Sequence, residues 1–222
     1  MSTADVATAK VYDLLRSAIL TGEYEPSTRL TADAIAQKHG VSRTPVRDVL
    51  WRLHAEGLVE MIANQGAYVA NPSAGEIIEI YGLRAVMESH AASLAAARMT
   101  LTHLEELRRC ADVMEGAVEG SAEDRLTVLA VENDKFHKII TRASGNRRLA
   151  ALIASLTEIP SALKTLTAFS MQQLRRSQMH HYDLVSAFSE RDAAWARATM
   201  EAHILAARAS YVTETERQSQ RS

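Results

Sequence analysis

The sequence has few of the residues that cross-link, break or anchor a chain. It contains one cysteine, Cys110, which excludes an internal disulfide framework and suits a reducing cytosol. No apolar run reaches the roughly eighteen residues that a membrane-spanning helix needs, and we expect no export signal at the N-terminus. Only 4 Pro and 9 Gly occur in 222 residues, beside abundant Ala and Leu. These features predict a mostly helical, cytoplasmic protein with no membrane partner.

An excess of positive charge is also missing, because 25 Lys and Arg face 27 Asp and Glu, for a formal net charge of −2. Apolar residues make up 47% of the chain and charged residues 23%, as in an ordinary soluble globular protein. A chain of this length can bury a real core as one large or two modest domains. Nucleic-acid binding therefore has to be inferred from the local placement of charge.

The pattern of helices and turns changes near residues 71–73. Before this point, short elements are separated by Gly and Pro, whereas long helical segments follow it. These segments cover roughly residues 74–98, 102–119, 122–143, 147–158, 161–170, 173–189 and 191–214. We expect one domain over residues 1–71, a second over 74–214, and a disordered polar tail over 215–222.

The first half of the chain predicts two short helices and a hairpin. A helix from about Thr31 is followed by a tight turn, and a second helix covers about residues 43–55 behind Ser42 as its N-cap. The stretch "LVEMIANQGAYVA" alternates on both sides of a turn that ends at Gly66, as two short strands do. This order is that of a winged helix-turn-helix, with the helix-turn-helix at about residues 31–50.

The second of these helices carries the residues expected to read DNA. In a helix-turn-helix its N-terminal end lies against base edges in the major groove, which here places Ser42, Arg43, Thr44 and Arg47 there. An arginine can bind guanine O6 and N7 with two parallel hydrogen bonds, which discriminates by about 1–3 kcal/mol. Hydroxyls suit phosphates or base edges, and Gly66 at the hairpin tip can approach the DNA closely. The alternative is a solvated helix face, because the charges of this half nearly cancel.

The segment "GVSRTPVRDVLWRLHAEGLV" closely resembles the DNA-binding domain of the GntR family of bacterial transcription regulators. The resemblance implies that Arg43 and Arg47 read guanines, that Ser42 and Thr44 hold phosphates, and that Gly66 is the wing contact. The partner would be double-stranded operator DNA. Because operators are two-fold symmetric, we expect a homodimer.

This chain departs from the family pattern at two places. The family usually has Pro-Gly before the helix-turn-helix, where this chain has Pro26-Ser27-Thr28. It often has Arg where this chain has Asp33, so one phosphate contact that the resemblance implies is absent.

In the second half, the stretch "VENDKFHKII" places polar residues in a helix. Asn133 and His137 are four residues apart and fall inside its apolar stripe, so both should point inward. Asp134 lies about 100° around the helix. There it should pair with Lys138 and face solvent.

Two further histidines lie on apolar stripes of later predicted helices. His181 precedes the turn at residues 189–192 and His203 follows it, each roughly 13–18 Å from that turn along its helix. Antiparallel packing would bring them level with each other. Together with Asn133 and His137 they could hold a divalent metal, and nitrogen donors favour zinc or nickel. The alternative is that each histidine is a hydrogen-bonded core residue.

The stretches "ENDKFHKIITRASGNRRL" and "HYDLVSAFSERDAAWARATMEAH" resemble the all-helical FCD domain of FadR-type GntR regulators. Metal-binding members use Asp or Asn, then His four residues later, then two His 22 residues apart. Positions 133/137 and 181/203 match both spacings. The resemblance implies a metal whose open positions hold a small carboxylate effector. Arg84 could clamp a second acidic group of that effector, or it could pair with Glu88 within its own helix.

The sequence therefore predicts a mainly α fold, with an N-terminal winged helix-turn-helix and its β-hairpin wing and a C-terminal all-α bundle. Its predicted function is that of a metal-assisted, ligand-responsive transcription regulator, not an enzyme. Two alternatives stay open. A metal-dependent enzyme could use the three histidines, although no second inward carboxylate is evident. A constitutive DNA-binding protein could use them only to brace its core.

Overall fold

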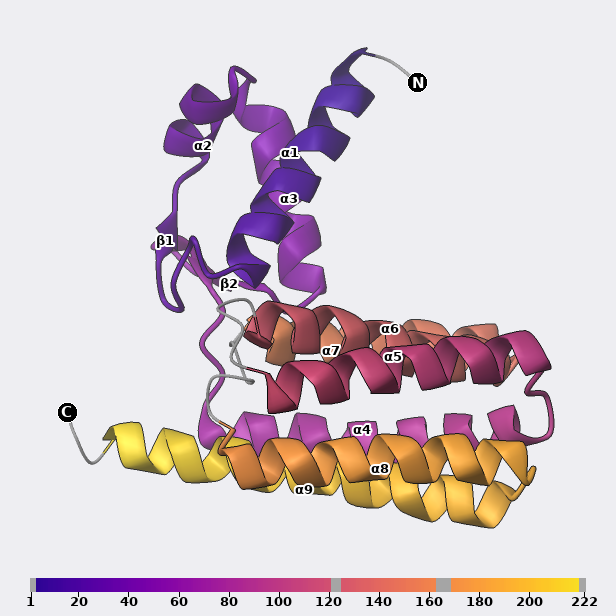
Figure 1. Ribbon diagram of the computed structural model, residues 1–222. Helices are drawn as coiled ribbons and strands as arrows, with labels where there is room; N and C mark the ends of the chain where they lie inside the picture. The colour runs from indigo at the N-terminus through magenta and orange to yellow at the C-terminus, as the bar shows by residue number, and fades with distance from the viewer. Residues whose placement is uncertain (1–2, 121–124, 163–168, 220–222) are drawn as a thin grey trace. The chain divides into compact units, whose positions relative to one another are not determined.

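The computed structural model describes residues 3–120, 125–162 and 169–219. The N-terminal unit is built from helices and a small sheet (Figure 1). Its elements are α1 (Thr3–Leu20), β1 (Arg29–Leu30), α2 (Ala32–His39), α3 (Arg43–Ala55), β2 (Val59–Ile62) and β3 (Gly66–Val69). The second predicted helix and the hairpin are found at the predicted residues.

Local interactions fix both ends of α2, the first helix of the helix-turn-helix. Thr31 caps α2, because its side chain accepts a hydrogen bond from the backbone N–H of Ala34. Gly40 ends α2 in the left-handed conformation, with φ of 66°, which a residue without a Cβ adopts without strain. The tight turn that the sequence predicts between the two helices is thus found at Gly40.

The wing is a three-stranded antiparallel sheet in the order β1-β3-β2. Val59 pairs with Val69 and Ile62 with Gly66 across the hairpin, while Arg29 of β1 pairs with Tyr68. The sequence does not predict β1, because a strand of two residues has no alternation to detect. The sheet and the helices enclose one core, in which α1 contributes a stripe four residues apart. The largest side chains that are at most 1% exposed there are Leu15, Ile19, Leu53 and Leu58.

The C-terminal unit is a bundle of long helices (Figure 1). They are α4 (Ala74–Ala96), α5 (Leu101–Glu119), α6 (Arg125–Ala143), α7 (Arg147–Ala162), α8 (Met171–Ser189) and α9 (Ala193–Ser219). Helix α4 packs against α9 and α6, α5 packs against α6 and α8, and α8 packs against α9. Three of these helices begin with reciprocal capping boxes, at Ser73, Thr100 and Ser170, which satisfy free N–H groups at each start.

The ends of α7 and α9 differ most from those predicted. Helix α7 continues through Pro160 to Ala162, so the break expected at Pro160 comes later. A proline removes one backbone hydrogen bond, and near the end of a helix that loss leaves only a short stretch affected. The helix expected over residues 161–170 falls largely outside the described residues. Helix α9 runs to Ser219, through part of the tail that we expected to be disordered, and residues 220–222 lie outside the description.

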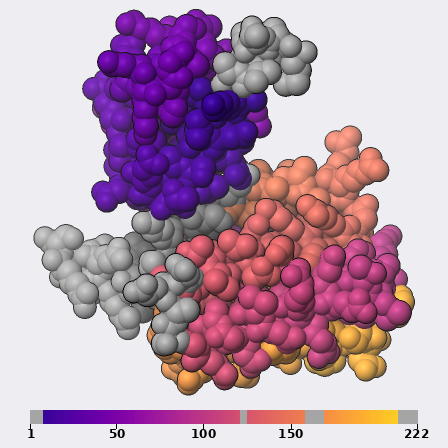
Figure 2. Space-filling model, turned by 45° about the horizontal axis from the view of Figure 1, so that its top comes forward, coloured from indigo at the N-terminus to yellow at the C-terminus, as the bar shows by residue number. Residues whose placement is uncertain are grey.

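Contacts divide the chain into two compact units with a boundary between Pro72 and Ser73, and the end of α7, residues 155–162, is grouped with the first unit. In the space-filling view, the residues of the N-terminal unit form one compact body, coloured indigo to violet (Figure 2). No helix among the described residues is long and apolar enough to cross a membrane. The predicted fold class, a winged helix-turn-helix followed by an all-α unit, is confirmed.

Candidate DNA-binding surface and candidate metal centre

Helix α3 buries one face and exposes the other. Its buried side chains are Val46, Val49, Leu50 and Leu53. On the exposed face lie Ser42, Arg43, Thr44 and Arg47, the residues that the sequence assigns to DNA. Ser42 occupies the N-cap position, yet its hydroxyl makes no cap hydrogen bond. The helix start therefore offers hydroxyl and guanidinium groups, together with backbone N–H groups that favour phosphate.

One of these arginines has a partner within the protein. The Nε atom of Arg43 lies 2.6 Å from Oδ1 of Asp33, in the first turn of α2, and the two side chains are 68% and 66% exposed. Sequence reasoning registered Asp33 only as a missing phosphate contact. The structure shows that this carboxylate touches the predicted base-reading residue.

At the wing, Gly66 is exposed and has φ of 108°, a conformation that side chains rarely adopt. A Cβ atom at this position would lie 3.9 Å from Nε of Arg29. Sequence reasoning missed Arg29 as a charged neighbour of the wing, because the two residues meet only through the pairing of β1 with β3. The wing thus combines a close-approach glycine with an exposed guanidinium.

In the bundle, the structure brings together the three predicted histidines. His137 on α6, His181 on α8 and His203 on α9 are all buried, and one nitrogen from each lies within 4.8 Å of the others. The rings of His181 and His203 have centroids 4.7 Å apart, as predicted from their positions around the turn. Asn133 is half-buried one helical turn before His137. Asp134 pairs with Lys138 at 2.6 Å on the exposed side, as predicted.

The hydrogen bonds of the histidines show which nitrogens face the centre. Nδ1 of His137 bonds to Glu88 at 2.7 Å, and Nδ1 of His181 lies 3.3 Å from Oε1 of Gln178. In the rings of His137 and His181, Nε2 is therefore the nitrogen that faces the centre. Nε2 of His137 lies 3.2 Å from Nε2 of His203. Nε2 of His181 and Nδ1 of His203 are buried and make no hydrogen bond in the part of the chain that the structure describes.

The protonation of these rings suits metal binding. Burial lowers the pKa of His181 and of His203 well below the usual value, and neighbouring imidazoles lower both further. The neutral ring, which carries a free lone pair, is the form that binds a metal. A buried nitrogen without a hydrogen bond costs free energy of folding. A cation bound by the converging nitrogens would offset that cost. The residues present therefore fit a divalent metal ion.

Glu88 is a buried carboxylate that the sequence identified only as a possible partner of Arg84. It is 2% exposed and bonds both to Nδ1 of His137 and, at 2.8 Å, to Nε of Arg84. Burial acts to raise the pKa of Glu88, but Arg84 and His137 outweigh it and hold that pKa at about 2. A carboxylate behind a histidine fixes the ring and raises its basicity as a ligand. Its role could not be read from the sequence, because 49 residues separate it from His137.

Arg84 forms the pair with Glu88 that the sequence gave as one of two alternatives. Its guanidinium also lies over the ring of Tyr81, 4.8 Å from the centroid, and its side chain is 11% exposed. The charge of Arg84 is close enough to His203 to help lower the pKa of that ring. Arg84 therefore lies near the three histidines, and its Nε is bonded to Glu88.

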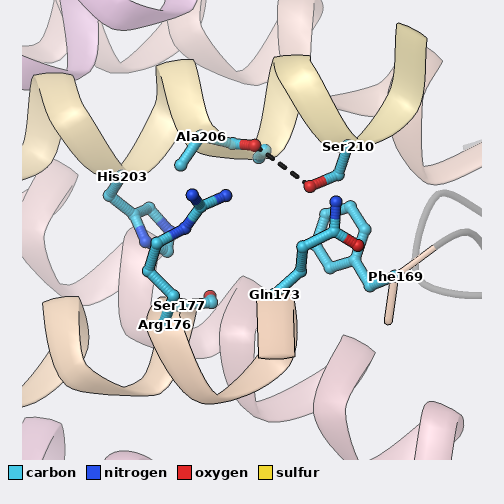
Figure 3. Close-up of a pocket in the computed structure, with 8 residues that line it drawn as sticks. Phe169, Gln173, Arg176, Ser177, His203, Ala206 and Ser210 are labelled. Carbon is cyan, nitrogen blue, oxygen red and sulfur yellow. Dashed lines mark hydrogen bonds between the residues drawn. The ribbon is translucent and has the colours of Figure 1, made fainter. Parts of the chain in front are cut away.

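A small pocket between α8 and α9 opens beside His203 (Figure 3). Arg176, Gln173 and Ser177 line it from α8, while Ser210 donates its hydroxyl hydrogen to the carbonyl of Ala206 on α9. The pocket contains the guanidinium of Arg176, which can bind an acidic group. Sequence reasoning did not identify these residues, since neither Arg176 nor Gln173 lies on an apolar stripe.

The other histidines are placed differently. His180 lies against His203 with ring centroids 5.8 Å apart, and its Nδ1 is buried and makes no hydrogen bond among the described residues. His103 serves in the capping box of α5. Cys110 is fully buried, and burial raises the pKa of its thiol to about 11.

Comparisons with known proteins give a family match for each half of the chain. Residues 79–206 match the FCD domain, and residues 7–69 match the bacterial regulatory proteins of the gntR family. The chain is similar to the HTH-type transcriptional repressor GlaR of Escherichia coli, with 26% identity over 87% of this chain and 90% of that protein. It is also similar to the uncharacterized HTH-type transcriptional regulator YdhC of Bacillus subtilis, with 28% identity over 67% of this chain and 65% of that protein.

A solved structure shares the fold. The structure of E. coli McbR/YncC superimposes with a TM-score of 0.74 at 23% identity, and the match covers 92% of this chain and 95% of that one. A likeness at this identity supports the arrangement of helices and strands within the chain. It does not extend to a ligand or an operator.

Proposed function

The chain belongs to the GntR family of bacterial regulatory proteins and carries an FCD domain, and on that premise we propose that this DNA-binding transcriptional regulator senses a small organic acid with the help of a bound divalent metal. One observation carries the proposal: three buried imidazoles converge, and two of their nitrogens make no hydrogen bond within the described residues. Zinc or nickel suits such a set of nitrogen donors.

The residues that would hold the metal come from three helices, α6, α8 and α9. His137, His181 and His203 would bind it through imidazole nitrogen, with the amide oxygen of Asn133 as a fourth ligand from the same face of α6 as His137. When bound, the ion supplies positive charge and open positions for oxygen ligands. Glu88 and Gln178 orient two of the rings from behind.

An acidic effector is supported by the charges around the histidines. Arg84 lies in the centre, and its terminal nitrogens are not part of its bond to Glu88, which uses Nε. Arg176 lines the pocket that reaches His203. Guanidinium groups bind carboxylates through parallel hydrogen bonds, so either arginine can hold an acid group that is not on the metal.

For DNA, the proposal assigns guanine reading to Arg43 and Arg47, phosphate contacts to Ser42 and Thr44, and the wing contact to Gly66. All five residues are exposed. A cytoplasmic homodimer would place two such surfaces on the two halves of an operator. An acid that binds one arrangement of the bundle better than another would shift the population, and thereby the affinity for DNA.

The first test is the metal content of the purified full chain, measured by mass spectrometry. We expect about one divalent ion per chain, lost in a His181→Ala, His203→Ala double variant and retained in a His90→Ala control, since His90 is exposed on α4. Chelation should lower the melting temperature of the wild type and leave that of the double variant unchanged. Equal melting temperatures before and after chelation, without metal, would mean that the histidines only brace the core.

The second test concerns the acid. Carboxylic acids titrated into the metal-loaded chain should bind with a heat signal that disappears in the double variant. Addition of a binding acid should change the affinity for a duplex selected from a random pool. If an acid is consumed rather than bound, the site is enzymatic. If DNA affinity ignores both metal and acid, the regulator is constitutive.

A further inference from the structure

We propose that Asp33 is a positioning residue for DNA specificity, which holds the guanidinium of Arg43 so that its terminal nitrogens face guanine and not phosphate. The inference rests on the proposed DNA-reading role of Arg43. The observation behind it is the contact of 2.6 Å between Oδ1 of Asp33 and Nε of Arg43.

Both side chains belong to helices that are anchored by buried residues. Asp33 lies in the first turn of α2, directly after the Thr31 cap, and the same helix is anchored by buried Ile35. Arg43 is the first residue of α3, which is anchored by buried Val46. Both side chains are about two-thirds exposed, so the pair lies on the surface at the end of α3 that a helix-turn-helix inserts into DNA.

The contact engages only one edge of the guanidinium. Arginine has five N–H groups, and the one on Nε is used by Asp33, which leaves the two terminal NH₂ groups. These terminal groups form the fork that gives two parallel hydrogen bonds to O6 and N7 of guanine. A side chain that is held in one orientation before binding loses less conformational entropy when it binds.

The carboxylate also acts against the wrong target. An unpaired arginine at a helix start is attracted to any phosphate, which strengthens binding to every sequence. A negative charge beside Arg43 weakens that attraction and repels phosphate, whereas guanine, which carries no formal charge, is repelled much less. Specificity is a difference between affinities, so weaker binding to unrelated DNA raises it.

Arg47 provides an internal comparison, one helical turn further along α3. It is exposed and forms no ion pair within the part of the chain that the structure describes. Its base preference should therefore be independent of Asp33. A variant of Asp33 that changes the preference at the Arg43 position alone acts through Arg43, whereas a general loss of charge would alter binding everywhere.

The experiment selects DNA from a random duplex pool with the full chain. The variants are Arg43→Ala, Asp33→Asn, Asp33→Glu and, as a charge-matched control, Asp13→Asn, because Asp13 is exposed on α1. Arg43→Ala identifies the base position that Arg43 reads. Wild-type protein should prefer guanine there by about 5- to 150-fold, which corresponds to the range for one bidentate contact.

We expect Asp33→Asn to reduce the guanine preference at that position by at least about 5-fold. It should also tighten binding to an unrelated duplex and steepen the dependence on salt. Asp33→Glu should restore part of the preference, and Asp13→Asn should leave it unchanged. Melting temperatures should stay equal, which separates positioning from folding.

The contrary outcomes are distinct. If Arg43→Ala changes the preference at no base position, the proposed reading role of Arg43 is wrong, and the inference fails with it. If Arg43→Ala removes a guanine preference that Asp33→Asn leaves intact, only the inference is overturned. Equal effects of Asp33→Asn and Asp13→Asn would also overturn it, because they would reduce Asp33 to general charge.

Discussion

Each unit of this protein has an arginine bound to a carboxylate through Nε, and the two pairs differ mainly in exposure. Arg43 and Asp33 lie 2.6 Å apart with side chains 68% and 66% exposed. Arg84 and Glu88 lie 2.8 Å apart with side chains 11% and 2% exposed. The distances are alike, but water screens the first pair and is nearly excluded from the second.

The difference in exposure separates two uses of the same chemistry. An exposed pair contributes little to stability, so it can orient a side chain toward a ligand such as DNA and can be altered without unfolding the unit. A buried pair cannot lose one member without leaving an unpaired charge in the interior. In the bundle, Glu88 also bonds to His137, so the buried pair is joined to the candidate metal centre.

The largest expected effect comes from breaking the buried pair. Glu88→Ala should lower the free energy of unfolding of the bundle by about 3–5 kcal/mol, because it leaves Arg84 unpaired and Nδ1 of His137 without a partner. Chemical unfolding followed by the fluorescence of Trp195, in a Trp51→Phe background, reports on this unit. Glu79→Ala, an exposed change on the same helix, is the control. Equal effects of the two changes would remove the contrast between the units.

A smaller effect should follow from removal of the amide behind His181. Gln178 lies 3.3 Å from Nδ1 of His181 and donates to the carbonyl of Ala111 at 2.6 Å. Gln178→Ala should weaken zinc binding by about 10- to 100-fold, as changes behind a metal ligand do. Competition with a chromophoric chelator measures this affinity. Gln172→Ala, exposed on the same helix, should leave it unchanged. Unaltered zinc affinity in Gln178→Ala would show that the amide does not orient the ring.

Helix capping tests whether every exposed polar contact is weak. Thr31→Ala should cost the DNA-binding unit about 1 kcal/mol, because one N–H at the start of α2 loses its acceptor. Unfolding is followed by the fluorescence of Trp51 in a Trp195→Phe background. Thr31→Ser keeps the oxygen and should recover most of the loss. If Thr31→Ala is neutral, water replaces the cap at no cost.

The smallest effect is expected from the exposed pair. Arg43→Ala should change the free energy of unfolding of the DNA-binding unit by less than about 0.5 kcal/mol, since surface ion pairs contribute little. The same measurement on Trp51 reports it. A loss of 2 kcal/mol or more, on the order of that expected for a buried pair, would show that Arg43 is a structural residue.

Features that depend on neighbours along one helix could be predicted from the sequence. The outward pairing of Asp134 with Lys138 and the inward position of His137 follow from helical spacing, and both are found. The helix-turn-helix was equally accessible, because its caps and turn lie within a few residues of one another. For Arg84 the sequence left two alternatives, and the structure shows the pair with Glu88.

Features that depend on contacts between distant segments could not be predicted. Strand β1 exists only through its pairing with β3, and the contact of Arg29 with the wing follows from that pairing. His180 gave no signal in its own helix, yet it lies against His203. Pro160 predicted a break that α7 does not show, since one missing hydrogen bond near a helix end is tolerated.

The sequence by itself determined the winged helix-turn-helix, the all-α second unit and the three histidines that face inward, because side-chain periodicity and local capping specify them. Only the tertiary structure decided which side chains bond to the inward histidines and to the arginine expected to read DNA. Glu88 meets His137 across 49 residues, and Asp33 meets Arg43 across the turn between two helices. Such contacts are set by how helices pack, and packing distances are not written in the spacing of residues along the chain.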